Sequence, residues 1–321
     1  MNVKVRFGTR DDIDALVEVN CSDVETWYHY SSEGRGNPAS YDELSSWERV
    51  MHGGPWMDRS ALIEYWKRME RLNIISLVAE LDGKVVGHLD VIFSEELSLG
   101  YFLYLDVLMV HKAYRRKGVA RTLIKEAEKL AKSRKAKFML VQPEEYEGPS
   151  GLTYRSCGFK KFLEVYVLET TIDVSKMPQD VCLTTIPQIQ EAPLKTHIMV
   201  CGWYNISVKM WDHGVNPSIE LSRVFSCPQL ALCVLTSEET YFFHIRRDYF
   251  NRLRGSITLW APISFNEKNL EHVFSAVKIV ASWLGIKHLT TRTIEKYKDL
   301  LEEVGFVLKS KAEPYLAKNL Q

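Results

Sequence analysis

Alternating apolar and polar residues predict strands, and apolar residues three or four positions apart predict helices, in an order that the chain repeats. The predicted elements of the first half are strands at 75–80, 84–93 and 101–110, a helix at 119–132 and a strand at 138–142. Asp82 and Gly83 separate the first two strands, and this pair is typical of a two-residue hairpin turn. The first half is therefore expected to form a mixed sheet with helices packed on it.

Residues 20–73 depart from this regular pattern and are rich in aromatic side chains. Glycine and proline interrupt the region, for example at Gly34, Pro38, Gly53 and Pro55, so we expect short helices joined by loops. Aromatic rings here could stack on a substrate ring or enclose a cation, although most are expected to be ordinary core. The aromatic residues are Trp27, Tyr28, Tyr30, Tyr41, Trp47, Trp56, Tyr65 and Trp66.

The second half follows the order of the first. Its predicted elements are strands at 230–235, 241–246 and 256–260, a helix at 273–284 and a strand at 287–292. The apolar positions of this helix match those of the first helix after a shift of 150 residues, which places Val273 on Leu123. A Gly-Phe pair ends a later helix in each half, at Gly158 and at Gly305. We therefore predict two copies of one fold.

The division between the copies is expected where the apolar pattern is interrupted. Lys176, Pro178, Gln179 and Asp180 form this interruption, and a chain of 321 residues is large for a single core. The sequence therefore predicts one domain at residues 1–172 and a second at residues 173–321.

The strongest candidate for a ligand-binding segment is the basic turn between the strand at 101–110 and the helix at 119–132. The side chains of Arg115, Arg116, Lys117 and Arg121 crowd this turn, and Gly118 lets its backbone close around a ligand without a Cβ. A helix N-terminus presents free N–H groups and a positive dipole end, which together bind phosphate. Neither the nucleotide-binding P-loop nor the dinucleotide glycine fingerprint is present. The turn is therefore predicted to hold a phosphate group by another arrangement.

Arg115-x-x-Gly118-x-Ala120 resembles the pyrophosphate motif of the GNAT N-acetyltransferase superfamily, Arg/Gln-x-x-Gly-x-Gly/Ala. The segment from Tyr154 to Phe159 is similar to the family's Tyr-x-x-x-Gly-Phe helix ending. This resemblance covers roughly residues 2–170 and implies an α/β (α+β) fold, a mixed and mostly antiparallel twisted sheet flanked by helices, here in tandem. Glu147 departs from the family, in which an asparagine often touches the pantetheine arm.

The resemblance implies that the chain uses acetyl-CoA as co-substrate. In the family, the pantetheine arm pairs with the strand before the turn, which is Leu108, Met109 and Val110 in this chain. The pyrophosphate would be bound by the turn, which is Arg115, Arg116, Lys117, Gly118, Val119, Ala120 and Arg121.

Two further residues match positions that handle protons in the family. Tyr154 matches the tyrosine that protonates the departing thiolate, and its alternative role is packing. Asp106 matches a carboxylate that acts as general base, and its alternatives are an ion pair or a loop cap. Period-two alternation places Asp106 on one strand face with Tyr104 and Leu108. His111 and His88 are expected to be a solvated and a partly buried histidine, respectively.

The second copy lacks the residues of the phosphate turn. After the same shift of 150 residues, Phe265 replaces Arg115, Lys268 replaces Gly118 and Leu270 replaces Ala120. Ser256 stands at the position of Asp106, and Leu301 at that of Tyr154. The second copy is therefore expected to bind no acyl-CoA and to shape the acceptor site, with Trp203, Tyr204, Trp211 and Trp260 as candidate contacts.

The composition narrows the possible partners. The formal net charge is zero, so no overall field recruits nucleic acid or an anionic membrane. No apolar run reaches the ~20 residues of a membrane span, and the N-terminus leads directly into a strand without the pattern of a signal peptide. The six cysteines lack Cys-x-x-Cys or zinc spacing, which favours reduced thiols in the cytoplasm and no metal site.

The sequence thus predicts an acetyl-CoA-dependent N-acetyltransferase that acts directly on a primary amine of a small molecule. The alternatives are a protein or peptide N-acetyltransferase and a non-catalytic acyl-CoA-binding regulator. A monomer or a homodimer is expected. The identity of the amine and the length of the acyl chain remain open.

Overall fold

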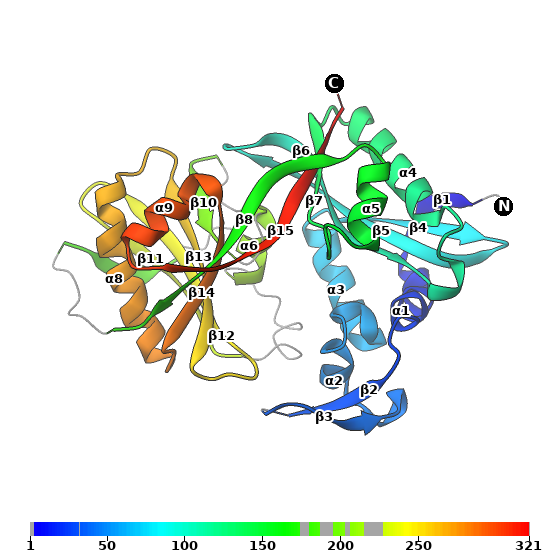
Figure 1. Cartoon of the computed structure of the whole chain (residues 1–321), viewed down its shortest axis with the longest axis horizontal. Helices are drawn as coiled ribbons and strands as arrows, with labels where there is room; N and C mark the ends of the chain where they lie inside the picture. Colours follow the sequence, from blue (N-terminus) through cyan, green and yellow to red (C-terminus); the bar gives the residue numbers. More distant parts are fainter. Residues whose placement is uncertain are drawn as a thin grey trace.

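The computed structural model describes residues 3–31, 33–173, 180–186, 195–202, 206–214 and 227–320. Two lobes share one mixed 13-stranded sheet, in the strand order β1-β4-β5-β6-β7-β15-β8-β14-β13-β12-β11-β9, with β10 paired to β13 (Figure 1). A separate two-stranded sheet, β2-β3, lies beyond α1 and α3.

The elements of the first half are β1 (Lys4–Phe7), α1 (Ile13–Cys21), β2 (Trp27–Ser31), β3 (Gly34–Ala39), α2 (Ser46–Val50), α3 (Arg59–Arg71), β4 (Ile75–Leu81), β5 (Lys84–Glu96), β6 (Gly100–Val110), α4 (Val119–Ser133), β7 (Phe138–Val141), α5 (Pro149–Ser156) and β8 (Lys160–Thr171). Those of the second half are β9 (Cys182–Thr185), β10 (His197–Cys201), α6 (Ser207–Gly214), β11 (Gln229–Leu235), β12 (Thr240–Arg247), β13 (Arg254–Pro262), α8 (Glu267–Trp283), β14 (His288–Ile294), α9 (Glu295–Glu303) and β15 (Val307–Asn319).

The predicted repeat is confirmed by the topology. The series β4-β5-β6-α4-β7-α5-β8 recurs as β11-β12-β13-α8-β14-α9-β15. In both halves the second and third strands pair antiparallel, and the third and fourth pair parallel. Gly158 follows α5 with φ 91°, and Gly305 follows α9 with φ 92°, so both Gly-Phe pairs use the left-handed conformation that glycine permits. The chain is a tandem of one fold.

The last strand of each copy is exchanged with the other copy. β8 pairs antiparallel with β14, and β15 pairs antiparallel with β7. The two exchanged strands also pair with each other and form the ribbon that connects the lobes (Figure 1). The division near residue 172 stays a prediction, with residues 174–179 outside the described part of the chain. Neither sheet is complete, however, without a strand from the other side of that division.

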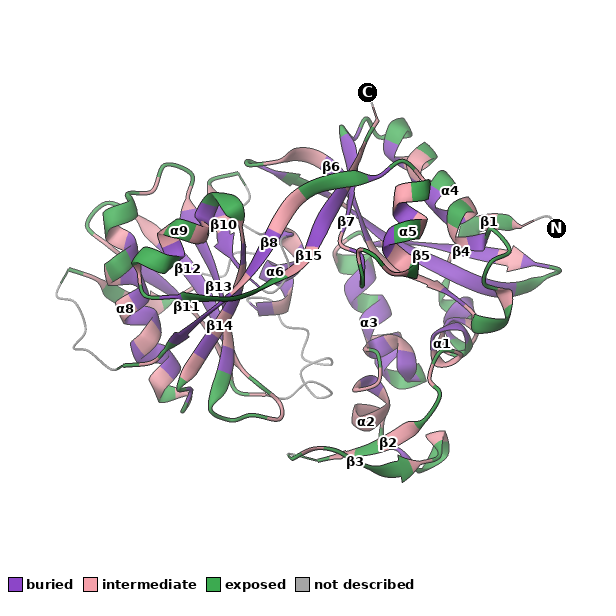
Figure 2. Cartoon of the chain, viewed as in Figure 1, coloured by how far each residue is buried: buried purple, intermediate pink, exposed green. Residues whose placement is uncertain are grey.

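Apolar side chains are buried on both faces of the sheet (Figure 2). In the first half, α4 and α5 cover one face through Leu123 and Tyr154, while α1 and α3 cover the other through Leu16 and Leu62. In the second half, α8 and α9 share one core, and α6 packs with Phe242 and Trp260 in another. Each copy is therefore a sheet between two layers of helix.

Residues 20–73 are more ordered than the sequence suggested. They form the hairpin β2-β3 and the 13-residue helix α3 in addition to shorter helical turns. Many of the aromatic rings pack on one another: the Trp27 ring centroid lies 5.1 Å from that of Tyr41 and 4.6 Å from that of His52. Tyr30 also reaches the second half, with its ring centroid 5.7 Å from that of Phe250.

Helix α6 joins the second half to the first through buried polar contacts. Its first residue, Ser207, donates its backbone N–H to the Glu96 carboxylate at 2.8 Å, and Glu96 is buried. Near the C-terminal end of α6, Asp212 pairs with Arg68 and Arg71 of α3 at 2.5 and 2.7 Å. Burial raises the pKa of Glu96 from 4.5 to about 7, while the bonds from Ser207 and Ser94 oppose this shift.

We expect Glu96→Gln to change how stability depends on pH. The folded state holds the Glu96 proton more tightly than the unfolded chain, so this group makes the free energy of unfolding fall as pH rises from 4.5 to about 7. The change is about 3 kcal/mol at about 1.4 kcal/mol per pKa unit. Denaturant titrations across this range should show the decline in the wild type and its reduction in the variant. Parallel curves for the two proteins would contradict the assignment.

A fragment of residues 1–172 is expected to aggregate or to bind CoA weakly. It would lack β15 and β14, so the edge of β7 and both edges of β8 would lose their partners. Unpaired strand edges and uncovered apolar surface promote association. Size-exclusion chromatography and calorimetry test this expectation. A soluble and fully active fragment would show that the second copy is dispensable.

Candidate active site

The candidate site lies where two parallel strands separate. β6 pairs with β7 only from Phe102 to Leu105, opposite Phe138 to Val141, and then continues to Val110. β7 ends just before Gln142-Pro143, and proline can neither donate a ladder hydrogen bond nor continue a central strand. The edge of β6 at Leu108, Met109 and Val110 is therefore not covered by β7, as an extended ligand arm pairing with it would require.

A β-bulge at Asp106 marks the point of separation. Asp90 of β5 is opposite Val107, but the next residue, Val91, is opposite Leu105, so Asp106 is the extra residue. The bulge interrupts the alternation of faces. Tyr104 packs with the α1–α3 core, whereas Leu108 packs with the α4 core. The prediction that Leu108 shares a face with Tyr104 was therefore wrong.

The basic turn takes the conformation of an anion cradle. Gly118 is the N-cap of α4 with φ 82°, and Arg116 also has a positive φ, 64°. The N–H of Thr122 donates to the Gly118 carbonyl at 3.0 Å, so the N–H groups of Val119, Ala120 and Arg121 precede the hydrogen-bonded ladder of the helix. A ligand anion at this helix end would receive these donors.

The cations of the turn do not all play the same part. Arg116, Lys117 and Arg121 are exposed, and the Lys117 ammonium lies 4.9 Å from the ring centroid of Tyr114. Arg115 instead donates from Nε to the Val110 carbonyl at 3.2 Å and pairs with Asp23 at 2.8 Å. Arg115 therefore ties the turn to the end of β6.

Asp106 and Tyr154 are both buried at the separation of the strands. The Asp106 side chain is 4% exposed, and its Oδ1 pairs with the Lys209 ammonium of α6. Its Oδ2 is buried and finds no hydrogen-bond partner among the described residues. Burial, with smaller contributions from Cys157 and Asp106, raises the pKa of Tyr154 well above its ordinary 10.0. The phenol therefore retains its proton at neutral pH and can donate it.

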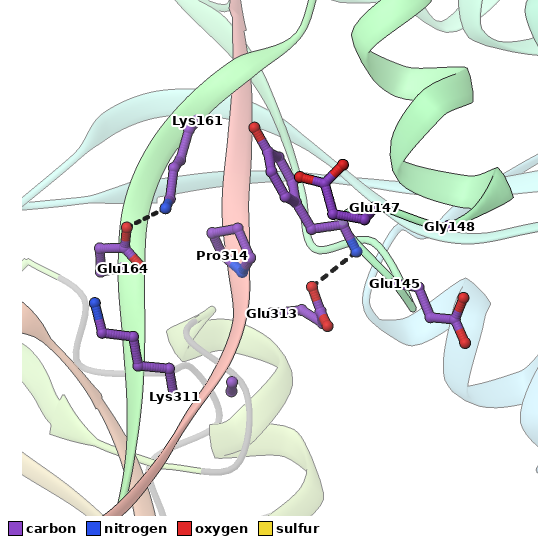
Figure 3. A pocket seen from close by; sticks show the side chains of 10 residues that line it. Glu145, Glu147, Gly148, Lys161, Glu164, Lys311, Glu313 and Pro314 are labelled. Atoms are coloured by element: carbon purple, nitrogen blue, oxygen red, sulfur yellow. Dashed lines mark hydrogen bonds and ion pairs between the residues drawn. The ribbon is translucent and has the colours of Figure 1, made fainter.

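An open cavity of about 590 Å³ lies near the C-terminal end of β7 (Figure 3). It is formed by the loop after β7 together with β8 and β15, and Tyr146 donates its backbone N–H to Glu313 of β15 at 2.8 Å. Since β6 and β7 are parallel, this loop and the phosphate turn lie at the same edge of the sheet. The lining residues are Glu145, Tyr146, Glu147, Gly148, Lys161, Glu164, Lys311, Ala312, Glu313 and Pro314.

The side chains that line the cavity are predominantly acidic. Four carboxylates face two ammonium groups, and Lys161 pairs with Glu164 in Figure 3. Glu147, which stands where the family often has asparagine, pairs with Arg155 at 3.1 Å. A cationic substrate suits such a surface better than an anionic one.

In the second half, the position of the cradle is filled by the protein itself. Glu239 accepts the backbone N–H of Asn266 at 2.9 Å and the side-chain amide of Asn269 at 2.8 Å. Asn266 in turn caps α8 by accepting the N–H of Lys268. A carboxylate thus sits at the N-terminus of α8, the counterpart of α4. The sequence showed the loss of glycine but gave no sign of this internal anion.

Of the four second-half aromatics that the sequence suggested as site contacts, the structure describes two, and neither lines a site. Trp203 and Tyr204 lie outside the described residues. Trp211 and Trp260 are 1% and 0% exposed and pack on each other with ring centroids 5.1 Å apart, so they do not line a site. Lys209 reaches Asp106 instead, and a single lysine in an apolar stretch carried no signal that could have revealed it.

The two histidines take different environments. His88 is fully buried, where Asn20 lies 2.9 Å from Nε2 and Asp90 lies 3.4 Å from Nδ1. His111 is partly exposed and accepts the backbone N–H of Ala113 through Nδ1. Both roles fit packing or capping rather than catalysis.

Comparison with known proteins finds one matching family. Residues 41–159 match the family described as Acetyltransferase (GNAT) family, so this part of the chain is similar to GNAT acetyltransferases. No curated protein sequence matches the chain. No helix among the described residues is both long and apolar enough to cross a membrane.

Solved structures with the same fold include GNAT proteins from bacteria. A GCN5-related N-acetyltransferase from Anabaena variabilis ATCC 29413 superposes with a TM-score of 0.61 at 13% identity, over 100% of this chain and 73% of that one. A GCN5-related N-acetyltransferase from Kribbella flavida superposes with a TM-score of 0.57 at 11% identity, over 99% of this chain and 71% of that one. A protein from Enterococcus faecalis V583, described as a probable N-acyltransferase, superposes with a TM-score of 0.58 at 11% identity, over 99% of this chain and 72% of that one. At these identities the likeness shows the fold alone.

Gly118→Val is expected to abolish CoA binding. Valine is strained at φ 82°, and its side chain would enter the open space beside the cradle, where an added Cβ meets no atom within 4 Å. Gly285→Val is a matched control, because Gly285 has φ 72° and equally open surroundings after α8. Calorimetry should find one CoA site per chain in the wild type and in the control.

Two observations would contradict this assignment of the cradle. One is an unchanged CoA affinity in Gly118→Val. The other is a second CoA site per chain, which would require the α8 end to bind despite Glu239.

Proposed function

We propose that the chain is an acetyl-CoA-dependent N-acetyltransferase that transfers an acetyl group directly to a primary amine of a small molecule. One observation carries this proposal: the Asp106 carboxylate keeps one buried oxygen without a described donor, at the bulge where β6 leaves β7. A buried acceptor without a donor is unfavourable, so this oxygen is suited to receive an N–H group from a ligand.

The cofactor would lie along the uncovered part of β6. The pyrophosphate would bind the N–H groups of Val119, Ala120 and Arg121, with Arg116 and Lys117 adding positive charge. The pantetheine arm would pair with the backbone of Leu108, Met109 and Val110. A backbone N–H on this strand would also receive the thioester oxygen as it becomes negative, and such a donor contributes about 3 kcal/mol to lowering a barrier.

Asp106 and Tyr154 would move the protons. Asp106 Oδ2 takes a proton from the ammonium group of the acceptor, and the neutral nitrogen attacks the thioester carbon. The C–S bond then breaks, and the Tyr154 hydroxyl protonates the departing thiolate. The acylated nitrogen gives its second proton to the Tyr154 phenolate, and Asp106 releases its proton to solvent. Binding the two reactants side by side supplies much of the remaining acceleration.

The acceptor would arrive from the side of the acidic cavity. Four carboxylates there favour a cationic amine, which supports both a small-molecule amine and a peptide amine as acceptor. The openness of this cavity favours, as a second candidate, a peptide amine. The six cysteines are free thiols, which supports a reducing compartment such as the cytoplasm. We expect a monomer or a homodimer whose second copy binds no acyl-CoA.

A thiol-release assay with acetyl-CoA and a panel of amines tests the proposal. Turnover on small amines supports the leading function, and turnover confined to peptides supports the second candidate. CoA binding without turnover on any amine would mark a non-catalytic acyl-CoA-binding regulator and reject both.

Tyr154→Phe is expected to lower kcat by roughly 10²-fold, as the loss of a general acid does, with CoA affinity nearly unchanged. The ring remains to pack against Phe159, whose centroid lies 5.6 Å away. Tyr297→Phe is the matched control, because Tyr297 is a buried tyrosine on α9, the counterpart of α5. Steady-state kinetics and calorimetry give both quantities. An unchanged kcat would assign Tyr154 to packing alone.

A further inference from the structure

Helix α6 is fixed on the first half at both ends of its length. At its beginning, the Ser207 N–H is bound by buried Glu96 of β5, and the Ser207 hydroxyl accepts Trp260 Nε1 at 3.0 Å. Near its end, Asp212 is held by Arg68 and Arg71. Lys209 lies between these contacts, so the path of its side chain toward β6 is determined by the docking of the helix.

The ion pair between Lys209 and Asp106 is shielded from solvent. The Lys209 and Asp106 side chains are 11% and 4% exposed, and the ammonium bonds to Oδ1. Arg68 also donates to the Lys209 carbonyl at 3.5 Å. Only one Asp106 oxygen is occupied, and the other finds no donor in the described part of the chain. The lysine therefore sets the orientation of the carboxylate and leaves one oxygen for a ligand.

We propose that Lys209 is a positioning residue, which holds Asp106 by Oδ1 so that Oδ2 faces the ammonium group of the acceptor. This inference rests on the proposed function. The first acceptor proton passes to Oδ2, the nitrogen forms the new C–N bond, and the C–S bond breaks as Tyr154 protonates the sulfur. The second proton of the acylated nitrogen then restores the Tyr154 hydroxyl. Lys209 itself takes no part in the proton transfers. The second copy thus takes part in catalysis through α6, although its own anion position is filled by Glu239.

The test compares Lys209→Met, Lys209→Arg, Asp106→Asn and the double variant Asp106→Asn/Lys209→Met in the full chain. Lys209→Met should lower kcat by about 10²-fold, because small misplacements of a reacting group cost on that order, and leave CoA affinity unchanged. Lys209→Arg keeps the cation and should recover most of the loss. If Lys209 acts through Asp106, the double variant should be no slower than Asp106→Asn alone.

Two controls separate positioning from folding. Lys318→Met removes another partly buried lysine, paired with Glu128 at 2.6 Å on the outer side of α4, and should leave kcat unchanged. Lys209→Met alone buries an unpaired carboxylate and is expected to be less stable. The double variant removes both charges, so it keeps the comparison available if the single variant unfolds.

Each result decides between distinct conclusions. Unchanged kcat in Lys209→Met, or losses that add in the double variant, would overturn the positioning role and leave the proposed function intact. An active Asp106→Asn would overturn the base role of Asp106 and the positioning role of Lys209, while acetyl transfer stands. Absence of turnover in the wild type on every amine, with CoA bound, would reject the proposed function and the positioning role together.

Discussion

The architecture depends on the exchange of one strand between the two copies. β8 completes the sheet that contains β14, and β15 completes the sheet that contains β7. Backbone hydrogen bonds at a buried strand must be satisfied, so neither copy can leave without exposing unpaired groups. The exchange therefore fixes the two copies relative to each other. It also carries Lys311, Glu313 and Pro314 of β15 to the cavity near the end of β7.

The junction formed by the exchanged strands determines where α6 lies on the first half. A helix that only connected two independent domains would bring Lys209 to Asp106 in some arrangements and not in others. Here the sheet is continuous, and the buried contacts at Glu96 and Asp212 add a second attachment between the halves. A charged pair that is this buried requires good geometry to offset its desolvation. The strand exchange supports that geometry because the sheet runs continuously through both halves.

Features that depend on local patterns of residues could be predicted from the sequence. The hairpin at Asp82-Gly83, the helix that begins at Val119 and the Gly-Phe endings at 158 and 305 follow from turn chemistry and periodicity, and the structure has all of them. The repeat was visible for the same reason. Strand partners were not, because period two shows which faces of β8 and β15 are buried and not which strand lies beside them.

The candidate site also has parts that could be predicted from the sequence and parts that could not. Its phosphate turn is a continuous segment, so Gly118 and the following helix could be recognised from residues adjacent in sequence. The bulge at Asp106 needs one more residue on β6 than on β5, and no local pattern records this difference. The partner of Asp106 is 103 residues away in sequence. Contacts of this kind arise from tertiary packing and could not be predicted from the composition of either segment.

The N-termini of α4 and α8, which occupy corresponding positions in the two copies, differ in whether the protein supplies an anion. At α4 the first-turn N–H groups face an exposed glycine turn, and a ligand must provide the anion. At α8 the position is taken by Glu239, which also accepts a hydrogen bond from the Tyr241 hydroxyl. The N-terminus of α8 thus has an anion from its own half. That half in turn contributes β15 and α6 to the packing of the first copy.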